Sequence, residues 1–318
     1  MCGIAGLIHK GKKSAPIGKE MASMLQALKH RGPDSTGFAF YGKSNAKQYI
    51  MRIKVAEGAD VAATHNKKGA WGIHEEIERR KEEVEKRMKG MGVKIKDVQQ
   101  PKEYAFRYIM EYDGDLRELA DRLEDLEGVE ILSLGRSLEL IKDLGDAATV
   151  VDGYGLDGFQ GTHAIGHTRM ATESDVDIRS AHPYWAYPYS DISVVHNGQL
   201  TNYWLRRRAL EHKGHRFSSD CDSELIAVYI ADKLEQGKTL EEAMRDSVND
   251  LDGVFTYLVA TGDSLGMAKD TMAAKPMVLY ESDDFIAMAS EEVAIRSVFP
   301  HEIDTYDPYE GEVKVWQN

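Results

Sequence analysis

The second residue of the chain is a cysteine, in the run Met1-Cys2-Gly3. An aminopeptidase can remove Met1 because the next side chain is small, and Cys2 would then carry a thiol and a free α-amine. An unperturbed α-amine has a pKa of about 7.7–8.0 and an unperturbed thiol about 8.5, so such an amine can act as the base for the thiol on the same residue. The position of Cys2 predicts nucleophilic chemistry; the alternative is a small residue that opens a buried strand.

An amide and a glycine follow an apolar run farther along the chain. Ile192 to His196 has a strand pattern, and Asn197-Gly198 comes directly after it. Asn-Gly after a strand is most often a hairpin turn, although the residues from Thr201 to Gly214 have a helical pattern. A side-chain amide beside a glycine N–H can also stabilise a developing oxyanion. The sequence leaves both interpretations open.

A cluster of polar residues precedes another apolar helix pattern. Ser218 to Glu224 contains Asp222, and it is followed by Leu225 and Ile226. Acidic residues at a helix start are favoured by the helix dipole, so the cluster can be a helix cap and nothing more. A carboxylate in this position can also receive the ammonium group of a substrate.

Several histidines raise the question of a metal site. They are His163, His167, His182 and His196. Their spacing matches no recognised zinc signature, and Cys221 is the only thiol besides Cys2. Histidines at strand ends are more often hydrogen-bonded structural groups. We therefore expect no metal and no cofactor.

These residues need a layered framework to hold them. Residues 2–8 and 38–41 have strand patterns, and residues 17–28 carry apolar side chains at helical spacing. From Gly161 onward, short strands alternate with helices. Several strands with two covering sets of helices fit an α+β domain.

The composition and the hydrophobic pattern of the chain change between residues 45 and 154. We interpret this stretch as a small α/β insertion in a discontinuous domain that comprises residues 2–44 and 155–318. Residues 74–89 are nearly all charged, which is typical of a solvated helix. The following patterns predict a strand, a helix, a strand and a helix at residues 104–112, 116–126, 129–134 and 137–144. The charged helix is expected to contact a second subunit or cover the active site, and a solvated elaboration is the alternative.

Composition limits the class of protein. The chain has 318 residues, a net charge of −13 and two cysteines, too few for a disulfide framework, which favours a reducing compartment. The apolar run before Lys10 is too short for a signal peptide or a membrane span. The acidic balance argues against nonspecific nucleic-acid binding. We expect a cytoplasmic protein that binds neither nucleic acid nor membrane.

Taken in chain order, the motifs resemble the glutaminase domain of class II glutamine amidotransferases, the N-terminal-nucleophile family. The resemblance rests on residues Cys2 to Gly6, His30 to Asp34, Gly166 to Thr172, His182-Pro183, Val194 to Gly198, Ser219 to Glu224 and Ala289 to Glu291. The sequence of residues 169–174 is most similar to the corresponding sequences of stand-alone glutaminase subunits of glutamate synthase and N-methylglutamate synthase type.

The resemblance implies a four-layer αββα sandwich and a role for each motif. Cys2 would attack the carboxamide carbon of L-glutamine, and Asn197 with the N–H of Gly198 would stabilise the oxyanion. Arg169 would hold the α-carboxylate as a planar fork, and Asp222 would receive the α-ammonium group.

The remaining implications concern the pocket edge and the partner. Met170 and Thr172 would line the pocket, and Arg31 would organise the site beside Cys2. Family members often have an aromatic residue after the arginine, where this chain has Met170. Free ammonia escapes, so a glutaminase without a synthase domain implies an ammonia-consuming synthase subunit. Homo-oligomerisation stays open.

Two other functions fit part of the pattern. An N-terminal-cysteine amidohydrolase of another amide would share Cys2 but would not need Arg169 and Asp222. A noncatalytic glutamine-sensing subunit would keep Arg169 and Asp222 but would tolerate the loss of Cys2 or Asn197. Both catalytic positions are occupied, which favours the glutaminase.

Overall fold

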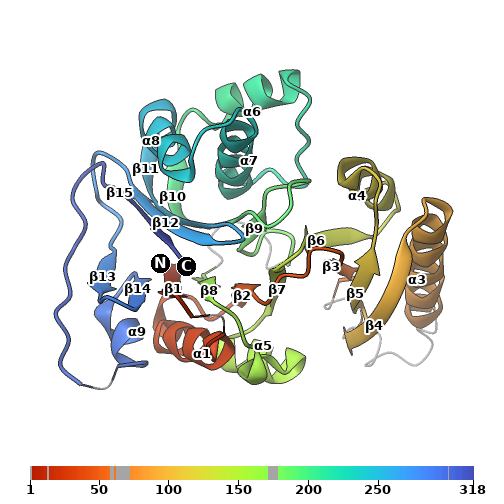
Figure 1. The fold of residues 1–318 in the computed structure, drawn as a ribbon, viewed down its shortest axis with the longest axis horizontal. Coiled ribbons are helices and arrows are strands. Elements are labelled where there is room, and N and C mark those ends of the chain that lie inside the picture. Colours follow the sequence, from red (N-terminus) through yellow and green to blue (C-terminus); the bar gives the residue numbers. More distant parts are fainter. Residues whose placement is uncertain (1, 13, 58–60, 62–71, 171–177, 300) are drawn as a thin grey trace.

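The structure is a computed structural model that describes residues 2–12, 14–57, 61, 72–170, 178–299 and 301–318. Two antiparallel sheets lie face to face in the larger part of the molecule, with helices on both outer sides (Figure 1). A third, smaller sheet lies beside them. Within the described residues, no helix combines the length and the apolar character that a bilayer crossing requires.

The first sheet contains the start of the chain. Its strand order is β13 (Val278–Glu281), β14 (Phe285–Ala289), β1 (Gly3–His9), β8 (His163–Arg169), β2 (Ser35–Tyr41) and β7 (Leu138–Leu144). The strand β1 is therefore interior and pairs antiparallel with β14 and β8. This arrangement fixes the residue before β1 from both sides.

The side chains of β1 alternate between the two faces of the sheet, as the pleat requires. Ile4 and Ile8 belong to the core between the sheets, whereas Ala5 and Leu7 belong to the core under the helices. At Gly6 a Cβ atom would lie only 2.8 Å from the Leu258 Cδ1 of the second sheet. Because both faces are covered, β1 is apolar throughout, without a polar face.

The second sheet supplies the other half of the sandwich. Its order is β15 (Val313–Gln317), β12 (Ser264–Lys269), β11 (Gly253–Ala260), β10 (Ser193–Leu200) and β9 (Tyr184–Trp185). All of its paired strands are antiparallel. The strand β10 runs through Asn197-Gly198, so the hairpin-turn interpretation of this pair is wrong.

Helices form the two outer layers. The first sheet is covered by α1 (Ile17–Ala27), α5 (Ala147–Tyr154) and α9 (Glu292–Arg296), with the short helices Lys29–Arg31 and Leu156–Gly158. The second sheet is covered by α6 (Tyr203–His212), α7 (Asp222–Glu235) and α8 (Leu240–Asp250). The expected four-layer αββα order is thus confirmed (Figure 1).

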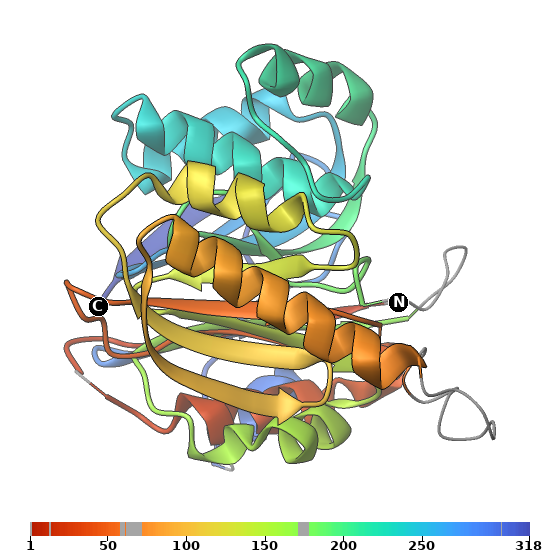
Figure 2. The same cartoon turned by 90° about the vertical axis from the view of Figure 1, so that its right-hand side faces the viewer.

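The small sheet has the strand order β4 (Lys94–Lys102), β5 (Ala105–Glu111), β3 (Tyr49–Lys54) and β6 (Glu130–Gly135). The helices α3 (Gly72–Gly90) and α4 (Leu116–Glu124) accompany it. Figure 2 shows α3 lying across this sheet. Only a narrow stripe of α3 is buried, at Ile77, Val84 and Met88, which explains its charged sequence. We call the part from β3 to β6 the inserted unit.

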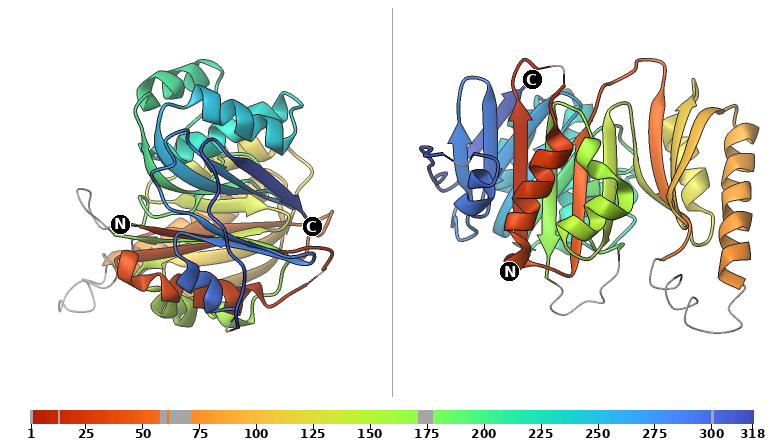
Figure 3. Two further views of the ribbon diagram at one scale, coloured as in Figure 1. Left: turned by 90° about the vertical axis from the view of Figure 1, so that its left-hand side faces the viewer. Right: turned by 90° about the horizontal axis from the view of Figure 1, so that it is seen from below.

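The structure corrects one element expected near the far end of the insertion. Residues 137–144 were expected to be helical, but they form β7, which pairs with β2 in the first sheet. The helix α5 packs against α1, and both lie on the outer face of that sheet (Figure 3). Residues 138–154 therefore belong to the sandwich, and we propose that the inserted unit ends near Gly135.

Candidate active site

Cys2 lies where strands of both sheets end. It directly precedes β1, and the pairing of Gly3 with Thr168 places it beside the end of β8. Its Sγ lies 3.9 Å from the backbone carbonyl oxygen of Met170, and the residue is half-buried. The thiol therefore sits against the segment that contains two of the expected substrate-binding residues, Arg169 and Met170.

The backbone carbonyl oxygen of Cys2 accepts two side-chain hydrogen bonds. Arg31 Nε donates at 3.0 Å and Asn197 Nδ2 donates at 3.0 Å. Both donor residues are buried, where hydrogen bonds are less weakened by competing water. The structure thus brings Arg31 and Asn197 into direct contact with Cys2.

The segment after β14 supports these contacts. Arg31 also donates to Glu291, and His30 Nε2 lies 3.0 Å from the other carboxylate oxygen. Burial alone would raise the pKa of Glu291, but the hydrogen bonds from Arg31 and His30 hold it below its usual value. Ser290 exchanges backbone and hydroxyl hydrogen bonds with Ile4 at 2.9 and 3.0 Å. Sequence reasoning gave Ser290 and Glu291 no role, and the only signal was their place in the resemblance.

The motif from His30 to Asp34 packs tightly on the end of β8. A Cβ atom on Gly32 would lie 2.5 Å from the carbonyl carbon of Arg169 and 2.7 Å from the nitrogen of Met170. The N–H of Asp34 donates to the Arg169 carbonyl oxygen at 3.1 Å. Glycine is therefore required at position 32, because any side chain would push Arg169 and Met170 away from Cys2. Thr172 lies outside the described residues.

Gly198 has a conformation that other residues adopt only with strain. Its φ is 145°, and a Cβ atom would lie 2.1 Å from the Val254 carbonyl oxygen. The strand β10 therefore continues past Asn197 only because residue 198 is glycine. The amide of Asn197 points back to Cys2 as a result of the strand geometry, and its Nδ2 also lies 3.4 Å from Ser290 Oγ.

Asp222 is the first residue of α7 and lies next to β10. The N–H of Leu200 donates to Asp222 Oδ2 at 3.0 Å, and His196 Nδ1 lies 3.5 Å from Oδ1. Burial would raise the pKa of this carboxyl, but His196, the Leu200 N–H and Ser223 together hold it below its usual value. With 21% of its side chain exposed, Asp222 is an ionised carboxylate that a small cation can reach.

The neighbouring Glu224 serves a different purpose. Its two carboxylate oxygens accept the backbone N–H and hydroxyl groups of Ser218 and Ser219, at 2.6–2.8 Å. Burial raises its pKa in spite of these bonds. The acidic cluster is therefore divided: Glu224 fixes the loop before α7, and Asp222 keeps an exposed edge.

Three of the four histidines, His167, His182 and His196, form a buried group behind Asp222, whereas His163 stacks on Tyr41. The ring centroids of His167 and His182 are 4.1 Å apart. Ser223 Oγ lies 3.1 Å from His182 Nε2 and 2.9 Å from His196 Nδ1. Burial lowers the pKa of His167 to about 3, which keeps this ring neutral. Within the part of the chain that the structure describes, no group of side chains is arranged to hold a metal ion.

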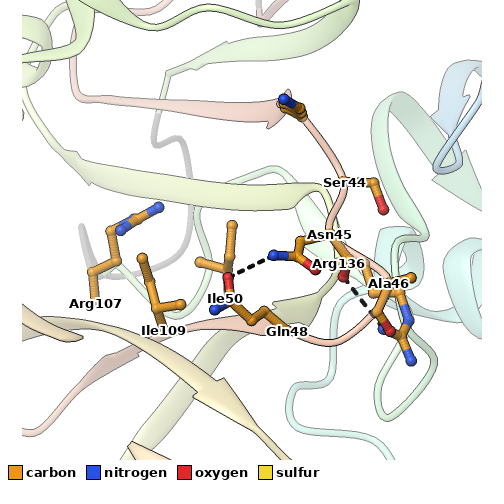
Figure 4. A pocket seen from close by; sticks show the side chains of 9 residues that line it. Ser44, Asn45, Ala46, Gln48, Ile50, Arg107, Ile109 and Arg136 are labelled. Atoms are coloured by element: carbon orange, nitrogen blue, oxygen red, sulfur yellow. Dashed lines mark hydrogen bonds between the residues drawn. The ribbon is translucent and has the colours of Figure 1, made fainter. Parts of the chain in front are cut away.

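A separate cavity of about 490 Å³ opens on the inserted unit (Figure 4). Its wall is formed by residues 43–46 and 48, by Ile50, Arg107 and Ile109 of the small sheet, and by Arg136. None of the residues that contact Cys2 lines it. This cavity is therefore distinct from the site at the end of β1.

Comparisons with known proteins identify the family. A sequence profile of the glutamine amidotransferase domain matches residues 167–297. A protein of Methanothermobacter thermautotrophicus that carries the name of a glutamine amidotransferase is 41% identical over 320 residues, covering 100% of both chains. The glutamine amidotransferase-like protein GlxB of Rhizobium meliloti is 32% identical over 292 residues, which are 92% of this chain and 89% of GlxB.

A solved structure has the same layered fold. It is that of glutamine phosphoribosylpyrophosphate amidotransferase from B. subtilis, with a TM-score of 0.59 and 18% identity, covering 100% of this chain and 47% of the other. At that identity the likeness concerns the fold alone. Since the relatives of higher identity match nearly the whole chain, the chain belongs to the glutamine amidotransferase family, in the class built on the N-terminal-nucleophile fold.

Proposed function

We propose that the chain is a glutaminase subunit in which Cys2, freed of Met1, attacks the carboxamide carbon of L-glutamine. The α-amine of Cys2 accepts the thiol proton through a water molecule and returns it to the departing ammonia. The resulting glutamyl thioester reacts with water, which releases glutamate and restores the thiol. The proposal rests on the two hydrogen bonds that Arg31 and Asn197 donate to the Cys2 carbonyl oxygen. They hold the nucleophile beside the Asn197 side-chain amide, which the reaction needs as an oxyanion donor.

Asn197 Nδ2 and the N–H of Gly198 are the proposed oxyanion donors. The hydrogen bond from Asn197 Nδ2 to Ser290 Oγ is long, at 3.4 Å. A negatively charged oxygen is a stronger acceptor, so it would displace Ser290 from this N–H. One such donor is worth roughly 2.7–4 kcal/mol in an acyl-transfer site.

The two ends of glutamine are proposed to bind on either side of Cys2. Arg169 receives the α-carboxylate and Met170 lines the wall, both supported by their close packing on Gly32. Asp222 receives the α-ammonium group, supported by its depressed pKa and its exposed edge. This pairing favours an α-amino acid amide over another amide.

The ammonia is proposed to pass to a separate synthase subunit of glutamate synthase or N-methylglutamate synthase type. Support comes from the sequence of residues 169–174. The identity of the ammonia acceptor rests on that short sequence alone. Purification with candidate synthase subunits, followed by glutamine-dependent synthesis, tests this part separately.

The glutaminase is tested by the intact mass of the protein before and after treatment with 6-diazo-5-oxo-norleucine, a reactive glutamine analogue. We expect loss of Met1 and a single adduct, and the control variant Cys2→Ala should form none. Retained Met1 would contradict the proposed base. A processed protein that forms no adduct would favour the glutamine-sensing alternative, and an adduct that excess glutamine does not suppress would favour an amidohydrolase of another amide.

A further inference from the structure

Three charged side chains are buried where the inserted unit meets the sandwich. They are Lys54 of β3, Glu130 of β6 and Lys142 of β7, each with at most 8% of its side chain exposed. Glu130 lies 2.9 Å from Lys54 Nζ and 3.7 Å from Lys142 Nζ. Buried charges are costly unless they are paired and hydrogen-bonded, so each of these groups constrains the others.

Lys142 also holds a segment that leads into the candidate site. Its Nζ donates to the carbonyl oxygens of Ala181 and Arg179, at 3.1 and 3.4 Å. Arg179 Nε lies 3.8 Å from Glu130, so the carboxylate attracts the same segment. The segment from residue 179 to 182 is therefore fixed by charges from both the sandwich and the inserted unit.

The other side of this segment is equally confined. Gly37 is the cross-strand partner of Lys142, and a Cβ atom on Gly37 would lie 2.0 Å from the His182 carbonyl oxygen. His182 thus rests directly on β2 while Lys142 holds the residue before it. A shift of the segment would move the His182 ring.

The ring of His182 connects this segment to the carboxylate proposed to bind glutamine. His182 Nε2 lies 3.1 Å from Ser223 Oγ, which is 3.4 Å from Asp222 Oδ1. Ser223 Oγ is also 2.9 Å from His196 Nδ1, and His196 itself faces Asp222. Polar contacts, joined by the peptide bond between Ala181 and His182, therefore connect Glu130 to Asp222.

We propose that Lys142, held by Glu130, is a positioning residue for the ammonium-binding carboxylate Asp222, acting through residues 179–182 and the His182 ring. The inference rests on the proposed function, since it assigns a task to the same glutamine site. Removing the Lys142 cation leaves the Ala181 carbonyl oxygen without this donor. The Arg179 carbonyl oxygen keeps only the Tyr184 hydroxyl, and Glu130 keeps Lys54, so the segment is held more weakly and relaxes. Cys2 and Asn197 are held by Arg31 and Ser290 instead, so glutamine binding weakens while the bond-forming step is preserved.

The test compares Lys142→Met and Glu130→Gln with a matched control, Glu139→Gln. Glu139 also lies on β7, is buried, and pairs with Arg52 and Arg107 of the small sheet at 2.6–2.8 Å. Its bonds join the same two parts of the molecule without touching residues 179–182. All three variants lose a buried charge partner, so the control reports the effect of a weakened junction by itself.

The measurements are KI and the maximal rate of inactivation by 6-diazo-5-oxo-norleucine, with KM and kcat for glutamine and the melting temperature of each variant. We expect Lys142→Met and Glu130→Gln to raise KI and KM by about tenfold while the maximal rates change less than about threefold. Glu139→Gln should leave KI and KM unchanged although its melting temperature falls.

Each outcome separates the two claims. If wild-type protein forms no adduct, the proposed glutaminase function is refuted, and the positioning role with it. If the wild type reacts but KI and KM stay constant in Lys142→Met or in the milder Glu130→Gln, only the positioning role is refuted. An equal rise in Glu139→Gln would also overturn it, because the effect would then be general destabilisation.

Discussion

The carbonyl oxygen of Cys2 is bonded by side chains that lie 29 and 195 residues away in the sequence. A residue that precedes the first strand has few local neighbours to orient it, so its geometry depends on these distant donors. Arg31 is in turn held by Glu291, and Asn197 lies beside Ser290. The nucleophile is thus fixed by three segments that meet only in the folded protein.

Replacing Asn197 should reveal its proposed role directly. We expect Asn197→Ala to lower kcat by about 10²–10³-fold, since one oxyanion donor is worth roughly 2.7–4 kcal/mol, with a smaller effect on KM. Steady-state glutaminase assays measure both constants. Gln199→Ala is the control, because Gln199 carries an exposed amide two residues farther along β10. A loss below about tenfold, or an equal loss in the control, would contradict the role.

The residues with distinctive chemistry could be predicted from the sequence, and their supporting partners could not. Cys2, Arg31 and Asn197 stand in recognisable motifs, and the structure brings them together. Glu291 is one of many acidic residues, and nothing local indicates that it pairs with Arg31. Such a partner is identified only when the fold brings distant segments into contact.

At the scale of elements, β10 and β7 show why local patterns are insufficient. Asn-Gly favours a turn in an isolated strand pair, but in β10 the pairing with β11 extends from Ser193 to Leu200. In β7, Leu138 and Ile141 have helical spacing, yet the segment pairs with β2 over its whole length. The charged Glu139 and Lys142 within it are buried by partners from other elements, so the alternation expected of a strand was hidden.

The strand geometry at Gly198 gives a prediction at this scale. Gly198→Ala should lower the free energy of unfolding by about 2 kcal/mol more than Gly237→Ala. Both glycines have a positive φ, so both variants are strained, but only at Gly198 would the new Cβ atom meet a backbone oxygen. Urea denaturation measures the difference, and equal losses would show that the strand accommodates the side chain.

The whole molecule joins two halves of a sandwich around one site. The first sheet takes most of its strands from residues 3–41 and 138–169. The second sheet is formed from residues 184–317, which also supply the strands β13 and β14 of the first sheet. The family resemblance implied the layer order, and the structure assigns each strand to its sheet. The helix expected at residues 137–144 is wrong, because this segment pairs with β2, and the proposed end of the inserted unit near Gly135 follows from that pairing.

Buried titratable groups predict how stability depends on pH. Burial lowers the pKa of His163 to about 4 and of His167 to about 3, and it lowers the pKa of His182 well below its usual value. In the unfolded chain these groups have a pKa of about 6.5, so below that pH the unfolded state binds protons that the folded state does not. Their contribution to stability is therefore lost as the pH falls from about 6.5 towards the folded values.

Two buried carboxyls act in the opposite direction. Burial raises the pKa of Glu124 to about 7 and also raises that of Glu224, so the folded state binds their protons at a pH where the unfolded state has released them. The three histidines take up protons in the unfolded state alone, and the two carboxyls offset part of that uptake. Between about pH 5 and 6, stability should therefore fall with acidification.

Single variants should change this slope in opposite directions. His163→Gln removes one histidine, and the slope should become shallower by roughly 1.4 kcal/mol per pH unit. Glu124→Gln removes a carboxyl that offsets the histidines, so the slope should become steeper by a similar amount. Urea denaturation at several pH values measures each slope, and His212→Gln, at an exposed position, is the control that should leave it unchanged. If every variant has the same slope of unfolding free energy against pH as the wild type, groups other than the buried histidines and carboxyls control acid stability.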